Sequence, residues 1–212
     1  MYSSMSSSAI NLRRVAISQP IIFRTGGCES LSDEDADALV QAGVRHFVDL
    51  RSRSERARYG YPVALSRRGV RHVRLPLTGY PSQPIDKARP TSQDYVQYYL
   101  GMAGARGPRL RRIVGVVRSL LDEPILVGCH CGKDRTGVVV ALTLRGLGLD
   151  ADLISRDYAL SGERLLAHLD RYEDKWTKRG HAREDYATRF ETAAETMRSF
   201  LDRLATDSSN CR

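Results

Sequence analysis

The chain has few cysteines and no long apolar run. Its four cysteines, in 212 residues, are too few and too unevenly spaced to form a disulfide framework. No window approaches the length of a membrane span, and residues 1–10 lack the basic start and the apolar stretch of a secretory signal. We therefore expect a cytoplasmic protein without a membrane span, in which at least one thiol is kept for its reactivity.

The chain also has fewer acidic than basic residues: it contains 25 Asp and Glu and 33 Lys and Arg, which gives a formal net charge of +8. This charge suits phosphate-bearing ligands, nucleic acid or an anionic membrane surface, and it selects none of them. The most basic run, residues 67–74, has no interleaved aromatic residues and matches no nucleic-acid motif. We interpret that run as a solvated face and expect no nucleic-acid partner.

Helical spacing and helix-end signals alternate with short apolar runs along the chain. Helices are predicted at 33–42, 92–103, 108–121 and 136–147, and strands at 44–50, 72–77 and 125–129. This alternation is typical of an α/β fold with a mostly parallel central sheet flanked by helices.

The length suits one domain. We expect a flexible N-terminus at 1–10, a single domain over 11–205 and a flexible tail at 206–212. Within the domain, residues 150–205 are predicted to form a helical C-terminal region. A Pro-rich stretch at 78–90 is predicted to be an exposed loop.

The sequence GCHCGKDRTG, residues 128–137, follows a predicted strand and leads into a predicted helix. Backbone N–H groups and the helix dipole at such a place favour an anion. Only Cys129, and not Cys131, is followed by an arginine at the C-x5-R spacing, which lets a sulfur and a bidentate guanidinium face one phosphate. A zinc site built from Cys129, His130 and Cys131 lacks a fourth ligand, so no metal is expected.

The run from Cys129 to Gly137 resembles the phosphate loop of the protein tyrosine phosphatase superfamily. It is most similar to the bacterial tyrosine and phosphoinositide phosphatases whose loop ends Gly-Lys-Asp-Arg-Thr-Gly. Segments 23–55, 94–100 and 156–161 are similar to that family as well. The resemblance implies the cysteine-phosphatase fold and a phosphoric monoester hydrolase that uses neither metal nor cofactor.

The resemblance also implies roles for individual residues. Cys129 is the expected nucleophile, forming a cysteinyl-phosphate that water hydrolyses, and Arg135 with the loop amides is expected to hold the phosphate oxygens. The hydroxyl of Thr136 is expected to stabilise the departing sulfur. The residues expected to bind substrate are His130, Cys131, Gly132, Lys133, Thr136, Gly137 and Arg51. Asp49, Arg51 and Glu55 match family positions that border the site, with a strand-end ion-pair network as the alternative interpretation.

Two questions remain open in this sequence. The acid that protonates the leaving group is expected to be Asp134, inside the loop, with Asp86 in the Pro-rich stretch as the alternative. The family usually has a histidine before the nucleophile, where this chain has Gly128. That histidine orders the loop, and His130 is a candidate to take over part of its work.

The expected substrate is phosphotyrosine or a small phosphorylated metabolite, such as a nucleoside phosphate in a biosynthetic pathway. A phosphoinositide is the first alternative, because Lys133 and Asp134 fit loops that accept multiply charged head groups. A non-catalytic phosphate-binding module is the second. A redox enzyme that pairs Cys129 with Cys131 leaves Lys133, Asp134 and Arg135 unexplained.

Overall fold

The structure, a computed structural model, describes residues 9–78, 87–105 and 107–209. The alternative acid Asp86 and most of the expected flexible N-terminus lie outside these residues. The internal contacts divide the chain into two compact units. The first unit comprises Met1–Thr78 and Arg109–Thr143, and the second comprises Gly79–Pro108 and Leu144–Arg212. The single-domain organisation stays a prediction.

The first unit is built on a sheet with the strand order β1-β2-β5-β3-β4. The strands are β1 (Arg13–Arg14), β2 (Ile22–Thr25), β3 (His46–Asp49), β4 (Arg71–Arg74) and β5 (Ile125–Gly128). β1 pairs antiparallel with β2, and the other neighbours are parallel. The prediction of a mostly parallel sheet is therefore confirmed. The sequence analysis predicted no strand at β1, which has only two residues, or at β2.

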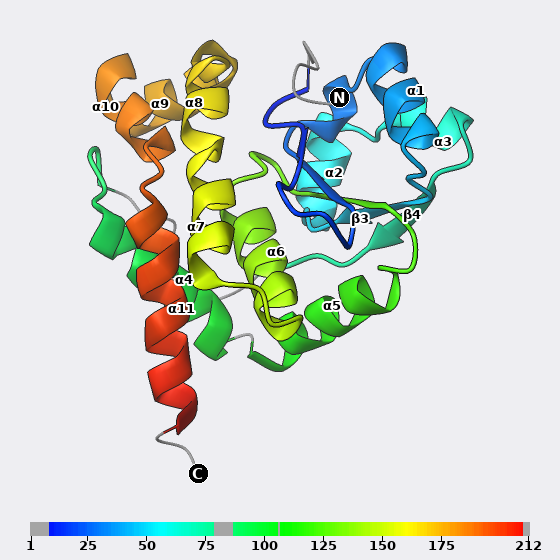
Figure 1. Ribbon diagram of the computed structural model, residues 1–212. Helices are drawn as coiled ribbons and strands as arrows, with labels where there is room; N and C mark the ends of the chain where they lie inside the picture. The colour runs from blue at the N-terminus through cyan, green and yellow to red at the C-terminus, as the bar shows by residue number, and fades with distance from the viewer. Residues whose placement is uncertain (1–8, 79–86, 106, 210–212) are drawn as a thin grey trace. The chain divides into compact units, whose positions relative to one another are not determined.

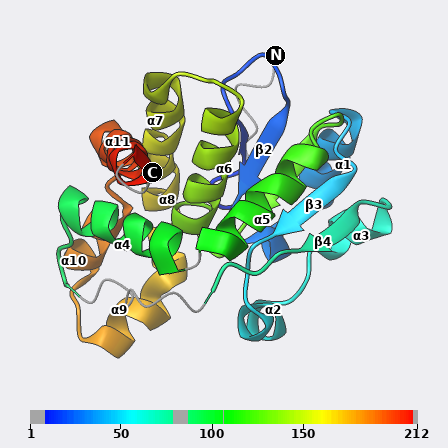
Figure 2. The same ribbon diagram turned by 90° about the horizontal axis from the view of Figure 1, so that it is seen from below.

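Helices cover both faces of this sheet. The helices of the first unit are α1 (Asp33–Gln41), α2 (Arg53–Tyr59), α3 (Val63–Arg67) and most of α5 (Gly107–Ser119) and α6 (Asp134–Gly146). Figure 1 shows α1 and α3 above the sheet and α5 below it, and α5 lies in front of the strands in the view from below (Figure 2). Ser32 caps the N-terminus of α1, because its side chain accepts the backbone N–H of Asp35.

Alternation along the strands divides the apolar side chains between the two faces. Phe23, Phe47 and Leu126 come from three neighbouring strands and belong to one buried cluster with Leu39 of α1 and Leu65 of α3. Residues beside Leu126 on β5 point to the opposite face, and all of β5 is buried. β5 is therefore a central strand, and the residue that follows it emerges from a packed core.

The second unit is helical, as predicted for residues 150–205. It contains α4 (Ser92–Ala105), α7 (Ala151–Ala159), α8 (Ser161–Leu166), α9 (Glu173–Arg179), α10 (Arg183–Ala187) and α11 (Ala194–Ser209). α11 packs along α4 and α7, and the ring of Tyr99 lies edge-on to the rings of Tyr158 and Phe200. α11 has no Gly or Pro and continues through Ser209, and the flexible tail expected at 206–212 stays a prediction.

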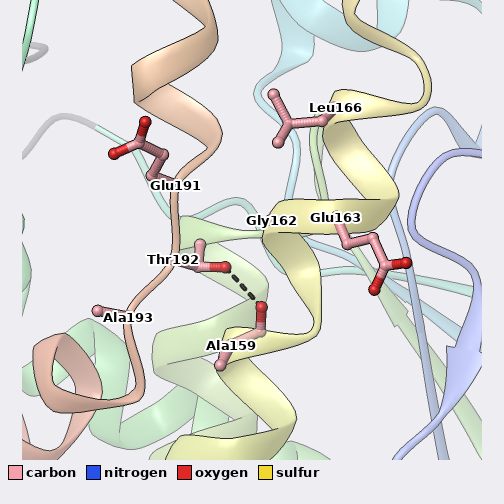
Figure 3. A pocket seen from close by; sticks show the side chains of 7 residues that line it. All are labelled: Ala159, Gly162, Glu163, Leu166, Glu191, Thr192 and Ala193. Atoms are coloured by element: carbon pink, nitrogen blue, oxygen red, sulfur yellow. Dashed lines mark hydrogen bonds between the residues drawn. The ribbon is translucent and has the colours of Figure 1, made fainter.

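A pocket of about 450 Å³ lies in this helical unit (Figure 3). Its lining residues are Ala159, Gly162, Glu163, Leu166, Glu191, Thr192 and Ala193. Thr192 donates its hydroxyl to the carbonyl of Ala159 at 2.7 Å. The two charged side chains in the lining are carboxylates, so the pocket does not complement phosphate.

None of the helices in the described part of the chain is both long and apolar enough to span a membrane.

Candidate functional site

Cys129 lies at the carboxyl end of the central strand of the first unit. β5 pairs with β2 on one side and β3 on the other, ends at Gly128, and is followed by residues 129–133 and the N-terminus of α6 at Asp134. Ligands of parallel α/β sheets bind at such strand ends, where a helix N-terminus favours negative charge. Cys129 is 2% exposed, and its thiol is free. The strand-loop-helix arrangement predicted for this motif is confirmed.

Arg135 forms a bidentate ion pair with Glu55 of α2. Its Nη1 donates to Glu55 Oε2 at 2.7 Å and its Nη2 donates to Glu55 Oε1 at 2.6 Å. Charge-assisted pairs of this geometry fix the plane of the guanidinium. A guanidinium has five N–H donors, and the ion pair with Glu55 uses two of those of Arg135. The other N–H donors can therefore form a second planar contact, to a phosphate.

Hydrogen bonds to Ser52 at the start of α2 hold the Glu55 carboxylate in place. It is the third residue of α2, where its Oε2 accepts the backbone N–H of Ser52 at 2.7 Å and its own N–H donates to Ser52 Oγ at 3.0 Å. This capping box sets the Glu55 carboxylate before it meets Arg135. Burial acts to raise the pKa of Glu55, but the bonds and charge of Arg135 with the Ser52 N–H outweigh it and lower the pKa to about 2.

The side chains after Cys129 differ in exposure. Lys133 is 2% exposed, and its Nζ lies 3.5 Å from Oδ1 of Asp134, whose side chain is 27% exposed. Thr136 is fully buried, and its Oγ1 has no hydrogen-bond partner among the residues that the structure describes. A buried hydroxyl without a partner is costly, which is consistent with a group reserved for a reaction partner.

The ring of His130 packs against an aromatic neighbour. Its ring lies 4.5 Å from the ring of Tyr59, with 30° between the planes, and Cys131 is partly exposed beside it. In the described ranges, no group of three or more His, Cys, Asp or Glu side chains is arranged to hold a metal ion.

Gly128, where the resemblance expects a histidine, sits between two neighbouring strands. A Cβ on Gly128 would lie 2.9 Å from Thr25 Cγ2 and 3.0 Å from Phe47 Cε2. Thr25 is the partner of Gly128 in β2, and Phe47 belongs to β3. The absence of a side chain at position 128 is therefore a packing requirement of this sheet, since side chains from both neighbouring strands occupy the space.

We predict that Gly128→Ala lowers the free energy of unfolding by about 1–3 kcal/mol, because the added methyl group overpacks against Thr25 and Phe47. Thermal unfolding measures the effect. Gly115→Ala is the matched control: its Cβ would meet nothing within 4 Å on α5, so stability should stay equal or rise. Thr25→Ser removes Cγ2 and should partly rescue Gly128→Ala. Equal melting temperatures for wild type and Gly128→Ala would contradict the packing argument.

Arg51 lies in an ion-pair network under the strand ends. Its Nε and Nη2 each donate to Asp49 at 3.0 Å, and its Nη1 donates to Glu29 at 2.9 Å. Arg51 and Asp49 are fully buried. The arrangement matches the alternative interpretation of a strand-end network. A direct contact between Arg51 and substrate stays a prediction.

Two groups in and beside this network have shifted pKa values. Burial acts to raise the pKa of Asp49, but the bonds from His72 at 3.0 Å and from Arg51 outweigh it and lower the pKa to about 2. Burial raises the pKa of the Cys28 thiol well above its usual value. Cys28 is therefore held as a neutral thiol, which makes it a poor nucleophile.

Two residues that contact the loop were assigned no role from the sequence, although one of them, Arg24, lies in segment 23–55. Arg24 and Asn11 both bond to Gly132, across 108 and 121 residues of chain. The backbones also meet closely here: Gly132 has φ +68°, and a Cβ on it would lie 2.6 Å from the backbone of Thr25 and Gly26. No periodic signal marks such residues, because each is a single polar side chain in a short segment.

Comparisons with known proteins agree on one family. A profile of the tyrosine phosphatase family matches residues 10–210. A tyrosine-protein phosphatase of Nostoc commune is 29% identical over 154 residues, covering 72% of this chain and 52% of that protein. The triple specificity protein phosphatase PtpB of Mycobacterium tuberculosis is 29% identical over 172 residues, covering 67% of this chain and 61% of that protein. The chain thus spans between half and two thirds of these curated relatives.

A solved structure was also matched. TpbA of P. aeruginosa is 18% identical, with 71% of this chain and 73% of that chain covered and a TM-score of 0.37.

Proposed function

We propose, since the chain belongs to the tyrosine phosphatase family, that it is a cysteine-dependent phosphatase that hydrolyses phosphate monoesters through a cysteinyl-phosphate. The observation that carries the proposal is the single loop that begins at Cys129 and ends at Arg135, where the strand β5 meets the N-terminus of α6. Arg135 is held in a fixed plane by Glu55, which supports a role in binding a planar array of phosphate oxygens.

In the proposed reaction the Cys129 thiolate attacks phosphorus, a sulfur–phosphorus bond forms, and the bond from phosphorus to the ester oxygen breaks. The leaving oxygen takes a proton from Asp134 and departs as an alcohol or phenol. Water then attacks phosphorus, returns a proton to Asp134 and releases inorganic phosphate with the thiolate. Arg135 and the N–H groups of the loop stabilise the charge on the oxygens in both steps. The Thr136 hydroxyl donates to the sulfur as it leaves.

Asp134 is the proposed acid because it is the first residue of α6, directly after residues 129–133, with 27% of its side chain exposed, where a leaving group can reach it. We predict that Asp134→Asn slows an alkyl phosphate by about 10²-fold or more and an aryl phosphate by less, since a poor leaving group depends more on its proton. Steady-state kcat for phenyl-type and alkyl-type substrates measures the difference. Equal slowing of both would instead indicate that Asp134 positions its neighbour Lys133.

The proposed substrate is phosphotyrosine or a small phosphorylated metabolite. Phosphotyrosine is supported by the similarity to a tyrosine-protein phosphatase. A screen with phosphopeptides, nucleotides, sugar phosphates and phosphoinositides, with EDTA present, tests the proposal. We expect metal-independent release of phosphate from at least one class. Phosphate binding without turnover of any class would favour a non-catalytic binding module.

A further inference from the structure

Loop carbonyls of the site accept hydrogen bonds from the N-terminal part of the chain. The carbonyl oxygen of Gly132 accepts Asn11 Nδ2 at 2.9 Å and Arg24 Nη2 at 2.7 Å. Arg24 Nη2 also lies 3.3 Å from the carbonyl oxygen of Lys133. The N–H of Gly27 donates to the carbonyl of His130 at 2.9 Å. Carbonyls along the loop are thus directed toward segment 11–27.

The direction of these carbonyls determines the direction of the loop amides. In a trans peptide the C=O and the N–H of the next residue point in opposite directions, and the loop peptides are trans. The carbonyls of His130, Gly132 and Lys133 point toward segment 11–27. The N–H groups of Cys131, Lys133 and Asp134 therefore point away from it, toward the side on which an anion can be bound.

We propose that Asn11 and Arg24 are positioning residues, which hold the loop so that its N–H groups converge on an oxyanion. The inference rests on the proposed function of the same loop and concerns how that loop keeps its shape with Gly128 in place of the expected histidine. Neither residue touches the reacting atoms in this proposal. They act through the carbonyls of Gly132 and Lys133.

The amide of Asn11 has only one orientation that satisfies both of its neighbours. Arg13 Nη1 donates to Asn11 Oδ1, and a guanidinium can only donate. The carbonyl of Gly132 on the other side can only accept, so it must face the Nδ2 group. Asn11 is 2% exposed and has φ +57°, a backbone conformation that asparagine tolerates better than most residues. The contact is therefore built into the fold and is not a surface contact.

Arg24 brings a buried positive charge under the loop. It is 1% exposed and lies on β2 beside β5. Burying a guanidinium is costly unless its donors are satisfied. The bonds to two loop carbonyls offset part of that cost, and the charge favours a phosphate bound above them.

Two variants remove these contacts with little change in shape. Asn11→Asp keeps an oxygen for Arg13 and replaces the donor to Gly132 with a second oxygen. Arg24→Met keeps the apolar stem and removes the guanidinium. Arg14→Met is the matched control, because Arg14 on β1 donates to the carbonyls of Ile17 and Ser18 and not to the loop. Asn11→Gly, which suits φ +57°, and Arg24→Lys serve where the first variants fail to fold.

Each variant is measured by its affinity for inorganic phosphate in calorimetry, and by kcat and KM with p-nitrophenyl phosphate. We expect Asn11→Asp and Arg24→Met to bind phosphate roughly tenfold more weakly, with a loss of kcat/KM at least as large. Arg24→Lys should recover part of the affinity, and Arg14→Met should match the wild type. Recovery by lysine separates positioning of the loop from a general loss of stability, which circular dichroism and thermal unfolding follow in parallel.

Wild-type phosphate affinity in folded Asn11→Asp and Arg24→Met would overturn the inference and leave the proposed function standing. A wild type that binds phosphate but turns over no ester would contradict the proposed function alone, and the affinities of the variants would still decide the inference. A wild type with no phosphate binding would overturn both. An equal loss of affinity in Arg14→Met would also overturn the inference, because the effect would then not depend on the loop contacts.

Discussion

Cys129→Ser is expected to lower kcat for p-nitrophenyl phosphate by at least about 10⁴-fold, because the variant lacks the nucleophile of the proposed mechanism. A serine hydroxyl at this position is a far weaker nucleophile than a thiolate at neutral pH, and no base is proposed to activate it. The loop, its amides and Arg135 are retained in this variant. Phosphate affinity should therefore stay within a few fold of wild type while turnover is lost.

Cys131→Ser is the control for this result, since it makes the same substitution two residues away. Cys131 lies outside the C-x5-R spacing and is partly exposed. Turnover in this variant should fall by less than about tenfold, the effect of a changed loop residue that carries no reacting atom. Comparable turnover by Cys129→Ser and wild type would refute the assignment of the nucleophile. A loss in Cys131→Ser as large as that in Cys129→Ser would favour a reaction in which both sulfurs take part.

Arg135→Lys is expected to lower kcat/KM by about 10³-fold, although it keeps the positive charge. The guanidinium of Arg135 meets both oxygens of Glu55 at 2.7 and 2.6 Å, and the proposal gives its remaining donors to the phosphate oxygens. An ammonium group has no planar fork, so it cannot hold a carboxylate and two phosphate oxygens at once. The loss should appear mainly in kcat, because charge spreads over these oxygens most strongly in the transition state.

The matched control is Arg145→Lys, an exposed arginine near the end of the same helix α6. It repeats the chemical change without touching the loop and should leave kcat/KM within about twofold of wild type. If Arg135→Lys retained wild-type kcat/KM, charge alone would suffice at this position. The bidentate geometry with Glu55 would then have a structural role and no part in binding phosphate.

Local patterns in the sequence predicted much of the first unit correctly. The apolar run at 125–129 and the helical spacing after it predicted β5 and α6, because both signals depend on neighbours within a few residues. The start of α1 was predicted for the same reason, and the C-x5-R spacing from Cys129 to Arg135 distinguished Cys129 from Cys131. The helical C-terminal region after Asp150 was also predicted from the spacing of residues within a few positions of one another.

The contacts that complete the site depend on segments far apart in the chain. Glu55 meets Arg135 across 80 residues, and Arg24 meets Gly132 across 108. These pairs arise because the strand order places β5 between β2 and β3, and no short-range pattern encodes that order. The division into two compact units is likewise a property of the three-dimensional contacts.

The motif GCHCGKDRTG therefore predicted by itself a phosphate loop after β5, with Cys129 at its start and Arg135 at its end. Only the tertiary structure decided why position 128 is glycine, since Thr25 and Phe47 of the neighbouring strands fill the space of a side chain there. It also decided that the loop carbonyls are bonded to Asn11 and Arg24. The physical reason is that spacing along a chain specifies local geometry, whereas packing and hydrogen-bond partners are specified by which strands become neighbours.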